Sequence, residues 1–242
     1  MMKYLKALIE ILINYRFNSI PILIFEIFFS IKYPNKYNKF KYYNSKSLSD
    51  PIPCSFYFLK KIEKFLNKKK IKYICDLGSG YGKVLFFFGK IKKYKIDGVE
   101  LDKEIYNESL DLKNNNINIY NKNILKFNFF NKKYELFIIN DPLKKLSDLK
   151  KLINKILRTK KKKYLILINL SKEKSNNIKK YLRVLDKIEI SSKRNIYFCS
   201  KNKILSFWCP HQESNLKLIL TMDVLCHLTI RAKFTILKKP MY

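Results

Sequence analysis

Short apolar runs alternate along the middle of the chain with segments whose apolar positions recur at helical spacing. The first pattern is typical of buried strands, and the second is typical of helices packed on one face. Strands are expected at 73–76, 94–100, 117–120, 135–140, 164–170, near 188 and at 196–199. Helices are expected at 57–66, 84–88, 103–113, 145–157 and 174–182. The last two strands have no helix between them, as a closing antiparallel hairpin requires, so the pattern predicts an α/β fold.

The first fifty residues carry two apolar segments and a polar loop. Apolar positions recur at helical spacing within residues 1–18, and a second apolar stretch covers 20–29. That stretch is too short to span a bilayer and carries Glu26 in its middle. It also lacks the cleavage site of a signal peptide. Its apolar side chains therefore serve a core, a partner surface or a peripheral membrane contact. Residues 33–49 are lysine-rich without periodicity, which predicts a loop.

Composition excludes a disordered chain and leaves the meaning of the charge open. The 242 residues include 47% hydrophobic side chains, enough for one domain with a sizeable core. Lys and Arg outnumber Asp and Glu by 51 to 19, a formal charge of +32, which favours a nucleic acid or an anionic membrane as partner. The alternative is base composition, because lysine is abundant in every segment together with Asn, Ile, Phe and Tyr, all of which have AT-rich codons.

Cysteine spacing indicates neither disulfides nor a metal centre. The five cysteines show no paired C-x-x-C spacing, so a reduced, cytosolic setting is expected. Near the C-terminus, Cys209, His211, Cys226 and His227 match no standard structural zinc site. We therefore expect no metal.

The strongest motif follows the first expected strand. Asp76 ends that strand, and Gly78, Gly80 and Gly82 follow at alternate positions before a helical pattern. Glycines allow unusual backbone angles and close approach of a ligand. A dinucleotide site has its third glycine three residues after the second, where this chain has Lys83. The spacing Asp-x-Gly-x-Gly-x-Gly instead resembles the first motif of class I S-adenosylmethionine-dependent methyltransferases.

Further residues agree with this resemblance. In that family an acidic residue at the end of the second strand accepts hydrogen bonds from both ribose hydroxyls, and Glu100 is at that place. A polar residue after the third strand binds the adenine amino group, a role that falls to Asn123, with Ile124 packing on the ring. A plain loop asparagine is the alternative for Asn123. The resemblance thus implies S-adenosylmethionine as cofactor, bound by Asp76, Gly78, Ser79, Gly80, Gly82, Glu100, Asn123 and Ile124.

The acceptor end is expected where the fourth strand ends. Class I enzymes present this end at the carboxyl edge of the central strands, and amino-methylating members often have Asn/Asp-Pro-Pro-Tyr/Phe there. This chain has Asn140, Asp141 and Pro142, followed by Leu143 and Lys144. Amine methylation is therefore allowed without being indicated. Asp141 is expected to orient the acceptor and also to take its proton, beside Asn140 and Pro142.

The resemblance covers residues 24–200 and extends to a poorly characterised bacterial branch of the family. In that branch a Pro-Thr-x-Tyr segment closes over the cofactor, whereas this chain has Pro53, Cys54, Ser55 and Phe56 and so lacks the Thr and Tyr hydroxyls. The implied fold is a Rossmann-like seven-stranded sheet of order 3-2-1-4-5-7-6 with an N-terminal helical extension. We expect that extension and a loop over 1–50, the cofactor-binding domain over 51–203 and a tail over 204–242.

The tail differs abruptly in character from the rest. Lysine density falls after Phe207, and the only Trp and both His residues occur there. The run Trp208–Leu216 resembles a translation of the reverse complement of the 3′ end of a transfer-RNA gene. We therefore expect that residues beyond about 203 are read-through sequence without a selected fold.

Taken together, the sequence predicts methyl transfer from S-adenosylmethionine to an N or O nucleophile whose identity stays open. The acceptor is a protein, a small molecule or RNA. The alternatives are a protein-lysine methyltransferase at a membrane surface, an RNA methyltransferase and a non-catalytic binder of the cofactor. The expected location is the cytoplasm, with peripheral membrane contact by the N-terminal segment as a further expectation.

Overall fold

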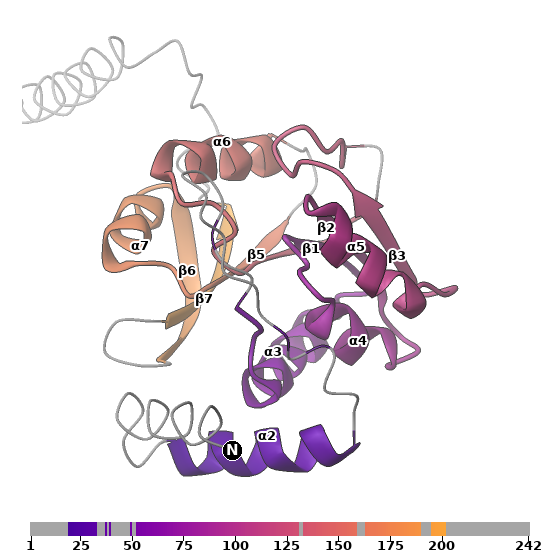
Figure 1. Cartoon of the computed structure of the whole chain (residues 1–242). Coiled ribbons are helices and arrows are strands. Elements are labelled where there is room, and N and C mark those ends of the chain that lie inside the picture. Colours follow the sequence, from indigo (N-terminus) through magenta and orange to yellow (C-terminus); the bar gives the residue numbers. More distant parts are fainter. Residues whose placement is uncertain are drawn as a thin grey trace, which may run out of the picture. The chain divides into compact units, whose positions relative to one another are not determined.

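The computed structural model describes residues 19–32, 37, 39, 49, 52–130, 133–158, 163–189 and 195–201. Its helices are α2 (Ser19–Lys32), α3 (Phe56–Lys69), α4 (Lys83–Gly89), α5 (Lys103–Ser109), α6 (Leu146–Leu157) and α7 (Lys172–Lys179), with a short 3₁₀ turn at Leu110–Leu112 (Figure 1). Its strands are β1 (Tyr73–Leu77), β2 (Lys95–Glu100), β3 (Ile117–Asn121), β4 (Leu136–Ile139), β5 (Tyr164–Ile168), β6 (Leu182–Glu189) and β7 (Asn195–Lys201).

These strands form one seven-stranded sheet in the order β3-β2-β1-β4-β5-β7-β6. Neighbours from β3 to β5 are parallel, whereas β7 pairs antiparallel with both β5 and β6. Parallel pairs need a crossover, which the helical segments supply, and the β6–β7 pair needs only a turn. The predicted α/β fold and strand order are confirmed.

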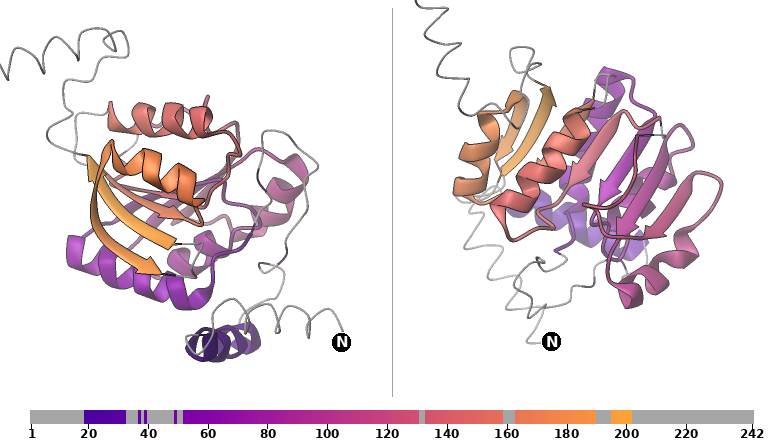
Figure 2. Two further views of the ribbon diagram at one scale, coloured as in Figure 1. Left: turned by 90° about the vertical axis from the view of Figure 1, so that its left-hand side faces the viewer. Right: turned by 90° about the horizontal axis from the view of Figure 1, so that it is seen from above.

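Two hydrophobic cores lie on opposite faces of the sheet. Side chains of a strand alternate between the faces, so Leu136 and Ile138 of β4 join one core while Phe137 and Ile139 join the other. The first core contains the buried faces of α3 and α4, and the second contains those of α6 and α7. Figure 2 shows α3 on one face of the sheet and α6 and α7 on the other. Burial on both faces explains why these strands are nearly continuous apolar runs.

The helix predicted at 174–182 lies two to three residues earlier in the structure, and the last predicted helical residue belongs to strand β6. The Ser171 hydroxyl accepts a hydrogen bond from the backbone of Lys174, so α7 begins at Lys172, and it ends at Lys179. Residues from Leu182 onward belong to β6, which is longer than the strand expected near 188. This edge strand exposes most of its side chains and carries charged residues, so its apolar pattern is weak.

The second apolar stretch forms α2, which packs on the first core by one face only. Phe29 stacks on Phe56 with ring centres 5.0 Å apart, and Phe25 meets Tyr57 edge to face. Four large apolar side chains of α2 stay more than half exposed: Ile24, Ile27, Phe28 and Ile31. Within the described ranges, no helix is long and apolar enough to cross a membrane.

The expected helical pattern at 1–18 and the expected tail at 204–242 lie outside the described residues. The domain boundaries and the read-through origin of the tail therefore stay predictions.

Candidate cofactor-binding site

A pocket of about 270 Å³ opens at the carboxyl ends of β1, β2 and β4. The strand order reverses beside β1 at this point, which is where open α/β sheets bind ligands. Its walls come from the loop after β1, the ends of β2 and β4, the loop after β3 and the chain just before α3. Nine predicted site residues line it: Asp76, Gly78, Ser79, Gly80, Glu100, Asn123, Ile124, Asn140 and Pro142.

The glycine loop has the backbone that its sequence predicts. Gly78, Gly80 and Gly82 all have φ between 54° and 86°, in the left-handed region that favours glycine. A Cβ at Gly78 would lie 2.6 Å from the Cβ of Pro142, so a larger residue would push the β4 loop away. Gly82 does not line the pocket. A Cβ at Gly82 would collide with Leu112, which gives Gly82 a helix-packing role.

Glu100 anchors the loop through its carboxylate. Oε2 accepts a hydrogen bond from the backbone N–H of Gly80 at 2.8 Å. Oε1 accepts from Leu101 and Asp102 at 2.8 and 2.9 Å. Burial raises the pKa of Glu100, although the three backbone donors oppose that shift. A carboxylate accepts about four hydrogen bonds, so one position remains on Oε2. In this conformation Glu100 has room for one ribose hydroxyl, whereas the resemblance implied two.

Asp76 carries a buried carboxylate oxygen that faces unmet hydrogen-bonding demand in the pocket wall. Its side chain is 1% exposed, and within the described part of the chain Oδ2 has no hydrogen-bond donor. The hydroxyl of Ser79 is likewise buried and without a partner there. Burial, and then the charge of Glu100, raise the pKa of Asp76 well above its usual value. Such groups cost free energy unless a ligand supplies donors, so Asp76 suits a cationic or hydrogen-bond-donating group.

Asn123 opens a tight turn after β3. Its Oδ1 accepts from the backbone of Leu125 at 2.9 Å, and its carbonyl accepts from Lys126 and Phe127. One acceptor position of the amide oxygen remains for an exocyclic amine. Ile124 is buried and forms an apolar wall with Leu101 and Leu125, which also line the pocket. A flat base suits a wall of this composition.

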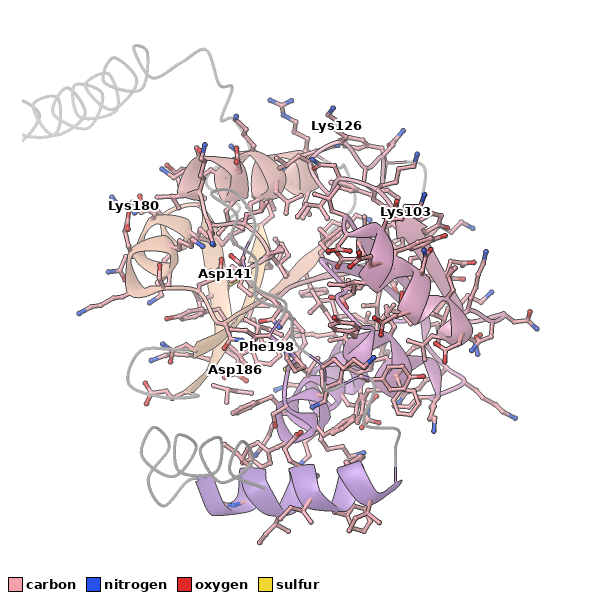
Figure 3. The ribbon with its side chains drawn as sticks, in the orientation of Figure 1. Lys103, Lys126, Asp141, Lys180, Asp186 and Phe198 are labelled. Carbon is pink, nitrogen blue, oxygen red and sulfur yellow. The ribbon has the colours of Figure 1, made fainter. Side chains whose placement is uncertain are left out.

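Of the expected acceptor residues, Asn140 and Pro142 line the pocket and Asp141 does not. Asn140 donates to the carbonyl of Ile52 at 2.6 Å and accepts from the amide of Asn169 at 2.8 Å. Asp141 has φ of 39°, and its Oδ1 is 2.6 Å from Nζ of Lys174. Figure 3 shows Asp141 near α7, the helix that carries Lys174. The Asp141 carboxylate therefore holds the loop after β4 to α7.

The pocket also contains residues from the N-terminal side, where the resemblance had placed Pro53 and Cys54 over the cofactor and where Ser49 and Ile52 were not foreseen. The backbone N–H of Ser49 donates to the carbonyl of Pro142 at 3.2 Å, and Ile52, Pro53 and Cys54 line the pocket. Ser55 instead caps α3 by accepting from the backbone of Tyr57. Lys83 also lines the pocket, and its position directly after the glycine motif was the available signal.

No protein-family profile matches the sequence. No curated protein matches it either. Solved structures do match the fold. The chain aligns with the methyltransferase domain of bacterial CtHen1 at a TM-score of 0.52 and 13% identity, over 60% of this chain and 97% of that one.

It also aligns with the N-methyltransferase NodS from Bradyrhizobium japonicum WM9 at a TM-score of 0.51 and 8% identity, over 61% of this chain and 96% of the other. A second NodS structure, in complex with S-adenosylhomocysteine, gives a TM-score of 0.50 at 8% identity, over 61% and 87% of the two chains. At these identities the likeness concerns the fold, and the chain has the fold of class I S-adenosylmethionine-dependent methyltransferases.

Proposed function

We propose that this chain binds S-adenosylmethionine in the described pocket and transfers its methyl group to an N or O nucleophile. The observation that carries the proposal is the buried carboxylate oxygen of Asp76, which lacks a donor among the described residues and lies beside the glycine loop and Glu100. S-adenosylmethionine carries an ammonium group, a ribose and an adenine. The pocket offers a complementary group for each.

The residues present fit the parts of this cofactor. Asp76 and Ser79 supply acceptors for the ammonium group, and Glu100 keeps one acceptor position for a ribose hydroxyl. Asn123 and the apolar wall of Leu101, Ile124 and Leu125 suit an adenine. Gly78 and Gly80 have no side chain, so a ligand can approach the backbone of the loop closely. Since Lys83 stands where the dinucleotide pattern has its third glycine, a nucleoside with an amino-acid moiety fits the motif better than a dinucleotide.

The cofactor supplies an electrophilic methyl group, so the protein has to orient the acceptor and exclude water. Asn140 and Pro142 lie at the pocket edge and are the groups proposed to contact the acceptor. Asp141 acts on them through the Lys174 ion pair, which fixes the loop that carries all three residues. A proton released by an amine acceptor can pass to water.

A methyl-transfer screen tests the reaction. Radiolabelled cofactor is incubated with the protein and, in separate samples, with RNA, protein and small-molecule fractions of a cell extract. Label appearing in one fraction identifies the acceptor class. If the cofactor binds and no fraction is labelled above the Asn140→Ala variant, the chain is a non-catalytic binder.

One alternative has a specific observation in its favour, namely methylation of a protein at a membrane surface. The exposed side chains of Ile24, Ile27, Phe28 and Ile31 recur at helical spacing and form one apolar stripe on α2. Residues 32–46 directly after them contain five lysines and no acidic residue. An apolar stripe beside a basic segment suits the interface of an anionic membrane. We therefore propose peripheral membrane contact as the setting of the reaction.

A further inference from the structure

Lys83 is a buried cation in the wall of the pocket. It is the first residue of α4, directly after the glycine motif, and only 5% of it is exposed. Its Nζ lies 2.8 Å from Oε2 of Glu26 and 4.1 Å from the centre of the Phe56 ring. An ammonium group at such a site needs anionic or aromatic partners to offset its desolvation.

Glu26 joins Lys83 to two other elements. Its second oxygen, Oε1, accepts a hydrogen bond from the backbone N–H of Phe56 at the start of α3. One carboxylate of α2 therefore contacts the first residues of both α3 and α4. The only acidic residue of this apolar helix thus points inward, toward the pocket wall.

The same cluster includes Cys54 and Asp76. Cys54 is buried, and the charges of Lys83, Glu26 and Asp76 all act on its thiol, whose pKa burial raises to about 12. Lys83 and Asp76 line the same pocket as this thiol, and Glu26 pairs with Lys83. The Cys54 thiol takes the place of the threonine hydroxyl in the methyltransferase branch that the sequence resembles. This thiol donates a hydrogen bond to the carbonyl of Ser55. Cys54 therefore lacks the hydroxyl that a threonine would offer to a ligand, so another side chain of the pocket has to make that polar contact.

Burial singles out Lys83 among the described lysines that line the pocket. Lys39, the other one, has a half-exposed side chain and pairs with Glu108 at 2.7 Å. Lys83 has three N–H donors, so it can keep Glu26 and still donate to a second carboxylate. Asp76, which lines the same pocket, has a buried acceptor without a donor in the described chain. A neighbouring cation and anion of this kind match the two charges of an amino-acid zwitterion.

We propose that Lys83 binds the α-carboxylate of the cofactor's amino-acid moiety while Asp76 faces its ammonium group, which makes Lys83 a specificity-determining residue for ligands that carry an amino acid. The inference rests on the proposed function, because it assumes that the pocket takes S-adenosylmethionine. It adds that Glu26 of α2 holds the ammonium of Lys83 in place for that contact.

Two ligands that differ only in this moiety test the inference. S-adenosylhomocysteine and 5′-methylthioadenosine share the nucleoside, but only the first carries the amino acid. Both are titrated by calorimetry into the full chain and into Lys83→Met, which keeps an unbranched side chain and removes the ammonium group. We expect the variant to lose about tenfold to a hundredfold in affinity for S-adenosylhomocysteine, as for a lost charged hydrogen bond, with its affinity for methylthioadenosine unchanged. Lys60→Met is the matched control: it breaks an exposed ion pair with Glu63 on α3, outside the pocket lining, and should leave both affinities unchanged.

Equal losses for both ligands in a folded Lys83→Met chain would overturn the inference and leave the proposed function intact. Binding of neither ligand to the unsubstituted chain would instead contradict the proposed function. Glu26→Gln covers the case in which Lys83→Met fails to fold. It removes the charge that holds the ammonium group of Lys83 in place, so affinity for S-adenosylhomocysteine should fall relative to methylthioadenosine, and an equal shift of both affinities counts against the inference.

Discussion

The Asp76 carboxyl is buried in the pocket wall, and Oδ2 has no donor in the described part of the chain. Its pKa is raised well above the unfolded value, first by burial and then by Glu100. A raised pKa means that the stability contributed by the group is fully present below the unfolded pKa, about 4, and is lost as pH rises through the folded pKa. The stability that protonated Asp76 contributes to the ligand-free protein at low pH therefore declines as pH rises.

Asp76→Asn should separate stability from binding. Because the variant carries no charge at this position, its ligand-free melting temperature should exceed that of the unsubstituted chain at neutral pH. The difference should shrink as pH falls toward about 4, where both side chains are neutral. The variant should also lose the rise in melting temperature that S-adenosylhomocysteine gives. Thermal unfolding across this pH range, with and without ligand, measures both effects, and an undiminished ligand effect would remove Asp76 from the site.

Local spacing made most of the pocket predictable at the residue scale. Gly78, Gly80 and Asp76 are close in sequence, and Glu100 follows the next strand, so a motif can assign all four. The pair formed by Lys83 and Glu26 joins positions far apart in the chain. No spacing rule reports such a contact. The ion pair between Asp141 and Lys174 could not be predicted either, because these residues are also far apart in the sequence.

At the scale of elements, the β4–α6 loop depends on the Asp141–Lys174 pair. Lys174 is buried and also donates to the carbonyl of Leu143 at 2.6 Å, so it fastens both ends of the turn around Pro142. The strand and helix order was predictable because buried strands and amphipathic helices have distinct periods. The start of α7 and the length of β6 were not, because a cap and an exposed edge decide them.

Asp141→Ala should leave Lys174 buried without its carboxylate partner and lower the free energy of unfolding by about 3 kcal/mol. Affinity for S-adenosylhomocysteine should be unchanged, since Asp141 does not line the pocket, while methyl transfer should fall as the loop loosens. Denaturant unfolding, calorimetry and turnover measure these three quantities. The double variant Asp141→Asn/Lys174→Met should recover much of the stability. Loss of cofactor affinity together with stability would make the loop part of the cofactor site.

The apolar stripe of α2 predicts binding to anionic vesicles. Replacing Ile24 and Phe28 with Ser should reduce the fraction of protein that sediments with phosphatidylglycerol vesicles by tenfold or more, on the order expected for two buried apolar side chains. Phe130→Ser, which replaces an exposed phenylalanine in the connection between β3 and β4, is the matched control. If the double variant sediments as the unsubstituted chain does, α2 does not contact the membrane.

At the scale of the whole molecule, the +32 charge does not by itself identify a partner. Lys103 begins α5, Lys126 lies in the loop after β3 and Lys180 follows α7, and Figure 3 shows these exposed side chains on separate parts of the described surface. Binding to RNA would give an affinity that falls steeply with salt, whereas binding of the zwitterionic cofactor should change little. The charge therefore leaves the acceptor class to the methyl-transfer screen.

The tail gives a prediction for the complete chain. If residues beyond about 203 are read-through from an antisense transfer-RNA gene, truncation after Lys203 should leave the affinity for S-adenosylhomocysteine unchanged. Calorimetry on the truncated and full chains compares the two. A genomic sequence without a transfer-RNA gene on the opposite strand would rule out this origin, and binding by the full chain alone would give the tail a role.

Calorimetric titration of S-adenosylhomocysteine into the full chain tests the central claim most directly, with Asp76→Asn as the control. The account predicts one site with a dissociation constant on the order of micromolar, and much weaker binding to the variant. Absence of binding to a chain that unfolds cooperatively would contradict the assignment of the pocket to this cofactor.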